Sequence, residues 1–250
     1  MPPQQHFGGD SRVSPGRSAF TLLELVAVIA VLVILAVILI PAIQSVRDKA
    51  RMSKTVSNLR QSTTAYLLLV QDSGGTVDVF RGGYNSAENW GYQLFRKDFI
   101  DGGNGRKALY AADRDDSAES GSWHWWTFGL NLFADNVETR KVEGDNGDTS
   151  MASINYMAVQ DPANYLLMAN SVYPGRSDFE SGDYVGSFRL YDRGVSEFGS
   201  IQVWPGTRTV PVATLDGAVT MADLDRLARL GVESIYDENG EVIDLTDLSD

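Results

Sequence analysis

The clearest pattern in the chain is a long apolar stretch near its amino terminus. It begins at Phe20 and contains one acid, Glu24, after which the 22 residues from Leu25 to Val46 carry no charge. A helix needs about 20 apolar residues to cross the hydrocarbon core of a bilayer, so residues 20–43 are predicted to form a transmembrane helix. A carboxylate inside such a helix costs about 2.5–3.5 kcal/mol on insertion scales, which predicts a partner and a function for Glu24.

The pattern becomes that of an amphipathic helix beyond residue 43. Residues 44–72 are predicted to continue the first helix to about residue 70, with a kink at Pro41 and an end at Ser73-Gly74-Gly75. The apolar face of this continuation needs a partner, which predicts packing against the domain that follows. Its residues recur mostly at steps of three and four: Ile43, Val46, Ala50, Val56, Leu59, Thr63, Tyr66, Leu67 and Val70.

Residues 76–250 are predicted to form one β-rich head. Two dipeptides, Asp216-Gly217 and Asn239-Gly240, predict two-residue hairpins. A short helix is also expected, capped by Thr220, with Asp223 completing the capping box, and ended by Gly231. The polar residues 134–151 predict a loop. The fold class is therefore α+β, with a long N-terminal helix packed on an antiparallel sheet. Branched and aromatic runs predict strands at residues 122–132, 153–159, 165–169, 184–190, 201–204 and 210–215.

Charge and composition narrow the classes of function. The formal net charge is −12, and only 6 of the 21 basic and 3 of the 33 acidic residues precede residue 55, which leaves 15 basic and 30 acidic residues after it. Such an acidic head excludes nucleic-acid binding as its main role. The chain has no cysteine and two histidines, His6 and His124, so disulfides, a thiolate nucleophile and a histidine-based zinc site or triad are not expected.

The residues around the start of the apolar run resemble the processing site of type IV prepilins and type II secretion pseudopilins. The run reads Ala19-Phe20-Thr-Leu-Leu-Glu24-Leu, after a polar leader of residues 1–19 that is rich in Pro and Gly. Glu24 is the fifth residue and Pro41 the twenty-second after Ala19, positions at which that family has Glu and often Pro. The chain departs from the family at Ala19, where most members have Gly.

The resemblance implies a function and a set of partners. A membrane prepilin peptidase would cut between Ala19 and Phe20, and the new terminal Phe20 would be N-methylated. Glu24 and Pro41 would then act in assembly with other pilin or pseudopilin subunits at an inner-membrane platform. The chain would be a single-pass inner-membrane protein, with its head in the periplasm or in an extracellular filament, and would be a structural subunit of a type II secretion pseudopilus or a type IV pilus, not an enzyme.

A second resemblance concerns the carboxyl-terminal half. The segment Val210-Pro-Val-Ala-Thr-Leu-Asp216-Gly217 is similar to a strand, Asp-Gly, strand segment in large pilin-like proteins of planctomycete and verrucomicrobial genomes. Those proteins often have a His ten residues before the Asp, where this chain has Gly206. The segment that begins at Asp161-Pro162 is similar to their Pro-led strand.

Other interpretations of the apolar helix remain open. It can be an ordinary signal anchor, in which Glu24 reaches the membrane interface, or the anchor of an extracytoplasmic binding module or enzyme. The flank after the apolar stretch contains Arg47, Lys49, Arg51 and Lys54, and by the positive-inside rule it would prefer the cytoplasm. That preference opposes the orientation implied by the prepilin resemblance.

Two groups of residues in the head are candidates for chemistry. Trp123-His124-Trp125-Trp126 fits a strand with half-buried aromatics, which we favour, or an exposed aromatic platform for a sugar, a cargo or a subunit. Oxygen ligands for calcium are available at Asp113, Asp115 and Asp116 and at Asp145, Asn146 and Asp148, but neither group has EF-hand spacing. A solvated acidic loop is the favoured interpretation of both, and no metal or other cofactor is predicted.

Overall fold

The computed structural model describes residues 21–82, 89–101, 104–112, 128–144, 147–177, 179–180, 186–187, 189–190, 192–197 and 199–248. The chain divides into two compact units, Met1–Arg47 and Asp48–Asp250. The described part combines one long helix with antiparallel sheets, so the predicted α+β class is confirmed.

The long helix, α1 (Leu22–Asp72), has 51 residues and continues through Pro41. It ends at Ser73-Gly74-Gly75, as predicted. Gly74 and Gly75 both have positive φ values, +68° and +88°, which glycine adopts without a steric penalty. The Gly75 N–H donates to the Val70 carbonyl at 2.9 Å, and this bond closes the last turn of the helix.

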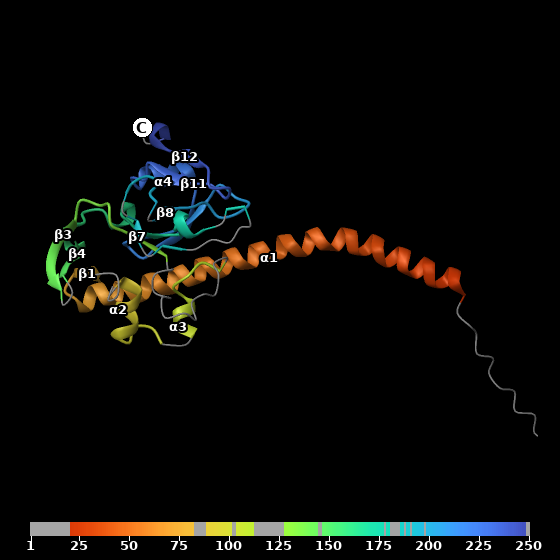
Figure 1. Ribbon diagram of the computed structural model, residues 1–250, viewed down its shortest axis with the longest axis horizontal. Coiled ribbons are helices and arrows are strands. Elements are labelled where there is room, and N and C mark those ends of the chain that lie inside the picture. Colours follow the sequence, from red (N-terminus) through yellow and green to blue (C-terminus); the bar gives the residue numbers. More distant parts are fainter. Residues whose placement is uncertain are drawn as a thin grey trace, which may run out of the picture. The chain divides into compact units, whose positions relative to one another are not determined.

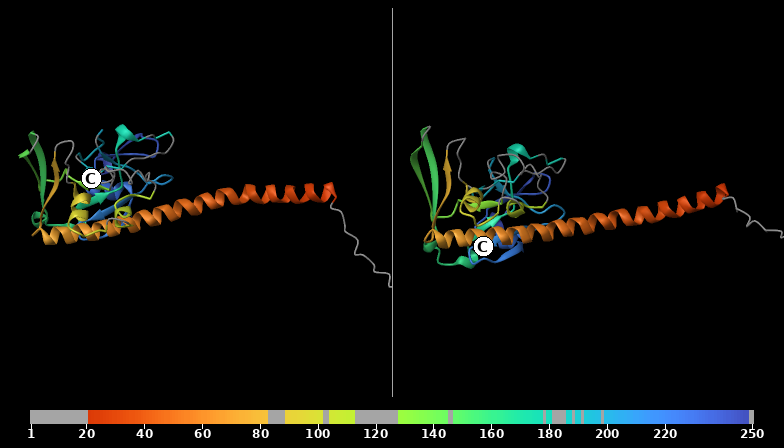
Figure 2. Two further views of the ribbon diagram at one scale, coloured as in Figure 1. Left: turned by 60° about the horizontal axis from the view of Figure 1, so that its bottom comes forward. Right: turned by 90° about the horizontal axis from the view of Figure 1, so that it is seen from below.

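A three-stranded antiparallel sheet lies beside the carboxyl end of α1 (Figures 1 and 2). Its strand order is β1 (Thr76–Gly82), β4 (Gly147–Asn155) and β3 (Val137–Gly144). The expected loop at residues 134–151 was wrong, because β3 and β4 pair continuously from Val137↔Ile154 to Gly144↔Gly147. A backbone ladder needs no apolar side chains, so the polar residues of this segment did not indicate strands.

A second sheet of five strands forms the centre of the head. Four of its strands are antiparallel: β10 (Val219–Ala222), β9 (Val210–Thr214), β5 (Leu166–Ala169) and β2 (Gly129–Asn131). A fifth strand, β7 (Arg189–Leu190), pairs parallel to β2. The predicted strands at 165–169 and 210–215 are confirmed. The runs at 122–132 and 184–190 form strands only at their carboxyl ends within the described residues, and the run at 153–159 leaves its strand at Asn155.

Two short pairs complete the strand inventory of the described residues. They are β6 (Ser171–Val172) with β8 (Ser200–Ile201), and β11 (Ser234–Tyr236) with β12 (Val242–Asp244). The predicted strand at 201–204 is thus shorter and starts one residue earlier.

Both predicted hairpins are present, but each has a three-residue loop instead of two residues. In the first, the Gly217 N–H donates to the Thr214 carbonyl at 3.0 Å and the Thr214 N–H to the Ala218 carbonyl at 2.9 Å. Gly217 has φ +87°, as the glycine of a turn followed by a bulge requires. The Asn239-Gly240 hairpin repeats this arrangement, with Gly240 at φ +82°.

Short helices connect the strands. The helix predicted near residue 224 is α4 (Leu224–Arg229), and its cap is Asp223, whose carboxylate accepts the Arg226 N–H at 2.8 Å. The expected cap at Thr220 was wrong, because Thr220 lies in β10 and pairs with Val212. The end at Gly231 is confirmed, since Gly231 has φ +81°. The other short helices are α2 (Trp90–Arg96), α3 (Asn104–Lys107), η3 (Tyr156–Ala158), η4 (Pro162–Asn164), η5 (Pro174–Arg176) and η6 (Thr246–Leu248).

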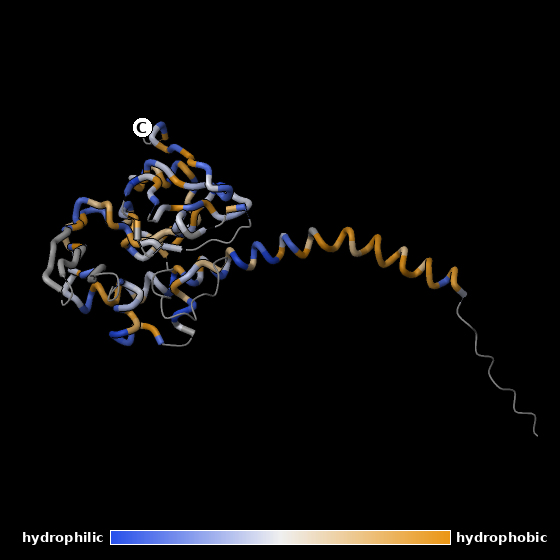
Figure 3. The backbone as a smooth tube through the Cα atoms, viewed as in Figure 1, coloured by the Kyte–Doolittle hydropathy of each residue, from blue (hydrophilic) through white to orange (hydrophobic). Residues whose placement is uncertain are grey.

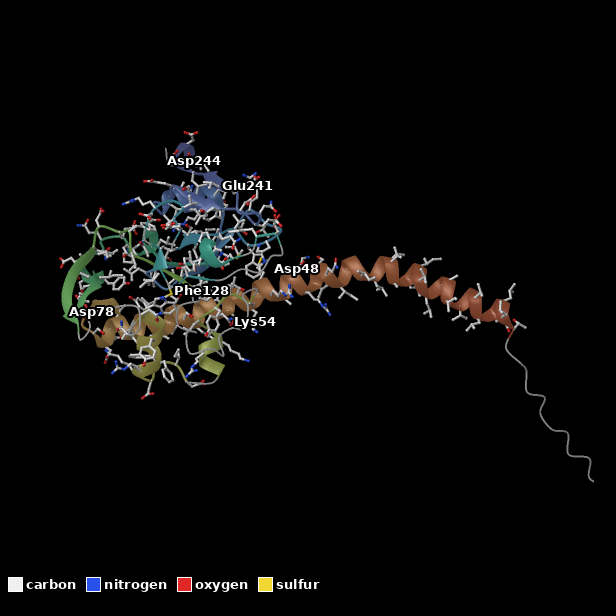
Figure 4. All side chains as sticks on the ribbon, in the orientation of Figure 1. Asp48, Lys54, Asp78, Phe128, Glu241 and Asp244 are labelled. Atoms are coloured by element: carbon white, nitrogen blue, oxygen red, sulfur yellow. The ribbon has the colours of Figure 1, made fainter. Side chains whose placement is uncertain are left out.

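The core of the head has two apolar clusters. The first joins α1 to the five-stranded sheet: Leu59, Tyr66 and Leu69 of the helix share it with Leu130 and Met168 of the strands. Phe128 belongs to the same cluster and is labelled beside α1 in Figure 4. The second cluster lies under α4 and the β11–β12 pair, with Leu227, Val232 and Ile235 among its members. The carboxyl-terminal part of α1 is therefore a core element of the head.

Candidate membrane and assembly helix

The acid of the apolar helix caps the helix that contains it. Thr21 precedes α1, and its N–H and Oγ1 both donate to Glu24 Oε2, at 2.9 and 2.8 Å. The Glu24 N–H in turn donates to Thr21 Oγ1 at 3.2 Å. This reciprocal pair is a capping box, which satisfies N–H groups that have no partner in the first helical turn. The role of Thr21 was not predicted from the sequence, although the spacing Thr-x-x-Glu indicates it.

The amino-terminal part of α1 presents apolar side chains on all sides. Every residue described between 21 and 46 is exposed, including Leu22 at 81 %, Val37 at 67 % and Ile38 at 66 %, and Figure 3 shows this part as a nearly unbroken apolar band. A soluble protein rarely exposes so large an apolar patch. Among the described residues, α1 is the one helix long and apolar enough to cross a membrane, a test that a signal sequence would also meet.

Basic residues follow the apolar band directly. Lys49, Arg51 and Lys54 are exposed, and the guanidinium of Arg51 lies 3.9 Å from the carboxylate of Asp48. Both partners are more than half exposed, and such a pair contributes on the order of 0–1 kcal/mol. This weak pair does not neutralise the flank, so the positive-inside rule still opposes the orientation implied by the prepilin resemblance.

Polar residues fix the second part of α1 to the head. Asn58 Nδ2 donates to the carbonyls of Lys107 and Tyr110, at 3.0 and 2.9 Å. Ser62 Oγ donates to the Ala108 carbonyl at 2.6 Å, and Thr55 Oγ1 accepts the Ala112 N–H at 2.7 Å. These three helix residues are buried, and their hydrogen bonds join the helix to the backbone of residues 107–112. Their spacing of three and four residues was visible in the sequence but was not interpreted.

The remaining predicted site residues are placed as follows. Pro41 lies within α1. Ala19, Phe20, the calcium candidates Asp113, Asp115, Asp116, Asp145 and Asn146, and residues 123–126 with His124 lie outside the described residues. Asp148 is in β4. Within the part of the chain that the structure describes, no three His, Cys, Asp or Glu residues gather closely enough to hold a metal ion.

A long apolar N-terminal helix packed against an antiparallel sheet is a pilin-like architecture. Comparison of the chain with protein-family models, with curated proteins and with solved structures gives no match. The function of the chain is therefore inferred from its architecture and from the residues of α1.

Proposed function

We propose that this protein is a pilin-like subunit of a type II secretion pseudopilus or a type IV pilus. The observation that carries the proposal is the dual composition of α1: an exposed apolar part suited to lipid or to a helical filament core, and a second part buried in the head. A helix of this kind can remain in the membrane before assembly and pack against identical helices afterwards, while the head stays folded.

Processing would prepare the helix for assembly. Cleavage between Ala19 and Phe20 would leave Thr21 as the second residue, so the capping box with Glu24 would persist in the mature chain. The box supplies two hydrogen bonds to the carboxylate but does not neutralise its charge. A buried carboxylate still needs a counter-charge, and the free amine of Phe20 on a neighbouring subunit would supply it and set the axial register.

The proposal names partners but no catalytic activity. The partners are other pilin or pseudopilin subunits, prepilin peptidase, the inner-membrane assembly platform and the inner membrane itself. The head would lie in the periplasm or in the filament. This orientation places the basic flank outside, against the positive-inside rule, so translocation of the head would have to override the charge preference.

Co-expression of the full chain with a prepilin peptidase tests the proposal. We expect intact-mass measurement to show loss of residues 1–19 and addition of one methyl group at Phe20. Phe20→Ala is a matched variant, because it changes the residue that would be methylated. It therefore shows whether cleavage and methylation at the terminal residue can be separated. A mature chain that retains Met1, or a cut beyond Ile43, would contradict the pilin-like function and support a signal anchor or a signal sequence.

A second candidate is a membrane-anchored binding module. It is favoured by a pocket in the head that gathers aromatic, amide and charged side chains, among them Phe133, Tyr165 and Arg193. The two functions are compatible, because the apolar part of α1 would serve assembly while the pocket of the head would bind a ligand.

A further inference from the structure

The pocket lies in the head between the segment after β2, the η3–η4 region and the end of α4. It has a volume of about 240 Å³ and opens to solvent. Six of its lining residues have side chains suited to recognition: Phe133, Asp135, Asn136, Asn164, Tyr165 and Arg193. Sites for drug-sized ligands measure roughly 300–1,000 Å³, so this pocket suits a smaller molecule, of the size of a single sugar ring.

Arg193 supplies the positive charge of the pocket. Its guanidinium carbon lies 5.8 Å from the centre of the Phe133 ring, and its Nη2 lies 3.8 Å from Asp135 Oδ1, beyond hydrogen-bond distance. The Asp135 side chain is fully exposed, and that of Arg193 is 43 % exposed. This weak pair leaves the guanidinium donors available to a ligand.

The backbone of Arg193 is bonded to the neighbouring segment of the head. Its carbonyl accepts the Glu233 N–H at 2.7 Å, which joins its backbone to the segment before β11. A Cβ at Gly231 would come within 2.9 Å of Arg193 Nη1. Gly231, which ends α4, thus leaves room beside the guanidinium of Arg193.

Amide and phenol groups of the same pocket are held in place by hydrogen bonds. The Tyr165 hydroxyl donates to Asn136 Oδ1 at 3.0 Å, and Asn136 Nδ2 donates to the Asn155 carbonyl at 3.0 Å. Arg226 Nη1 donates to Asn164 Oδ1 at 2.6 Å. Asn164 Nδ2 also donates to Asp161 Oδ2 at 2.7 Å, so each amide keeps one N–H and one oxygen lone pair for a hydroxyl group of a ligand.

We propose that this pocket binds a hexuronic acid, a sugar that carries one carboxylate. A guanidinium binds a carboxylate through two parallel hydrogen bonds, and the exposed Asp135 and the two amides can accept from or donate to the hydroxyls. Phe133 and Tyr165 offer apolar ring surface to the C–H face of the sugar. Asp135 would repel a dianion such as phosphate more strongly than a monoanionic sugar, which favours the carboxylate.

The test uses the full chain in a detergent whose headgroup is not a sugar, with glucuronate as the probe and calorimetric titration as the measurement. We expect saturable binding of glucuronate that weakens as salt is raised, and at least tenfold weaker binding of glucose and of acetate, which each lack half of the recognised groups. Arg193→Gln should reduce glucuronate affinity at least tenfold. Arg193→Lys should fall between, because an ammonium cannot form the bidentate pair.

The matched control is Arg229→Gln, which removes an exposed arginine of α4 that does not line the pocket. It should leave glucuronate affinity within twofold, and the thermal unfolding of both variants should match the unchanged chain. Absence of saturable glucuronate binding would overturn the proposal. Acetate that binds as tightly as glucuronate would also overturn it, because the sugar ring would then make no contact. So would an equal loss of glucuronate affinity in Arg193→Gln and Arg229→Gln, because the effect would then be one of general charge.

Discussion

The hydroxyl oxygens of Tyr66 and Tyr156 lie 2.8 Å apart in the core of the head, although 90 positions separate the two residues in the sequence. Both side chains are buried, and their rings meet edge to face with centroids 5.9 Å apart. Tyr156 meets Tyr165 in the same way at 6.1 Å. The pair joins α1 to the turn that follows β4, and so connects the helix with the three-stranded sheet.

Tyr66→Phe should lower the free energy of unfolding by about 1–3 kcal/mol, because it leaves the Tyr156 hydroxyl buried without this partner. The double variant Tyr66→Phe, Tyr156→Phe should lose less than the sum of the two single variants, since neither unpaired hydroxyl remains. Urea unfolding of a chain that begins at residue 48 measures both. Additive losses would show that the hydrogen bond contributes nothing to stability.

Alkaline titration should reveal the burial of Tyr66, Tyr156 and Tyr165. Burial raises the pKa of Tyr66 and of Tyr156, and it raises the pKa of Tyr165 to about 12. Because the folded values exceed the unfolded value of about 10, their stabilising contribution is complete below pH 10 and is lost as pH rises through the folded values. Of the ten tyrosines, we expect these to ionise only as the head unfolds, by ultraviolet absorbance and circular dichroism together. Ionisation of all ten near pH 10 in a folded head would contradict this.

The amino-terminal boundary of an independently folded head should lie before Thr55. A start at residue 48 keeps the hydrogen bonds between Thr55, Asn58 and Ser62 of the helix and residues 107–112. A start at residue 60 removes Thr55 and Asn58 and also Leu59, whose complete burial contributes about 1.5–3 kcal/mol. We expect the first chain to be soluble and to unfold cooperatively, and the second to melt at a clearly lower temperature. Equal melting temperatures would mean that this part of α1 is dispensable.

Substitutions at Glu24 can separate its charge from its capping role. Gln at this position keeps a capping box but removes the charge, whereas Ala removes both. If the carboxylate pairs with the Phe20 amine of a neighbour, Glu24→Gln and Glu24→Ala should both insert and lose their leader normally but fail to enter filaments. Glu24→Asp should assemble partially, being shorter by one methylene. Filament yield in a sheared surface fraction measures this.

Thr21→Val is the control for capping, because it removes the hydroxyl that donates to Glu24 and keeps the carboxylate. Under the charge hypothesis this variant should assemble nearly as well as the unchanged chain. If Glu24→Gln assembles normally and Thr21→Val does not, capping of α1 and not charge pairing is the function of this end of the helix.

Local patterns made much of the fold predictable from the sequence. The apolar run and its amphipathic continuation predicted α1 to within about two residues at each end, because periodicity and the Ser-Gly-Gly end act over short distances. The glycines at 217 and 240 predicted both hairpins, since each occupies a left-handed turn position. The β3–β4 hairpin was missed because its strands are polar, and hydropathy alone cannot distinguish a polar strand from a loop.

The pocket was not predictable by the same means. Phe133, Tyr165 and Arg193 come from three segments that are brought together only by the five-stranded sheet and the end of α4. No spacing rule links them. The Tyr66–Tyr156 pair is another contact of this kind. The two residues are close in space but far apart in the sequence, and no sequence pattern links them.

The burial of α1 in the head also sets the order of events during synthesis. The helix is synthesised before the residues that pack against it. Ala108, which bonds Ser62, follows it by 46 residues, and Tyr156, which bonds Tyr66, follows it by 90. Contacts of such long sequence separation slow folding, and apolar surface that is uncovered meanwhile is prone to aggregate. The nascent chain therefore passes through a stage in which the helix is complete and the head that covers its apolar face is not.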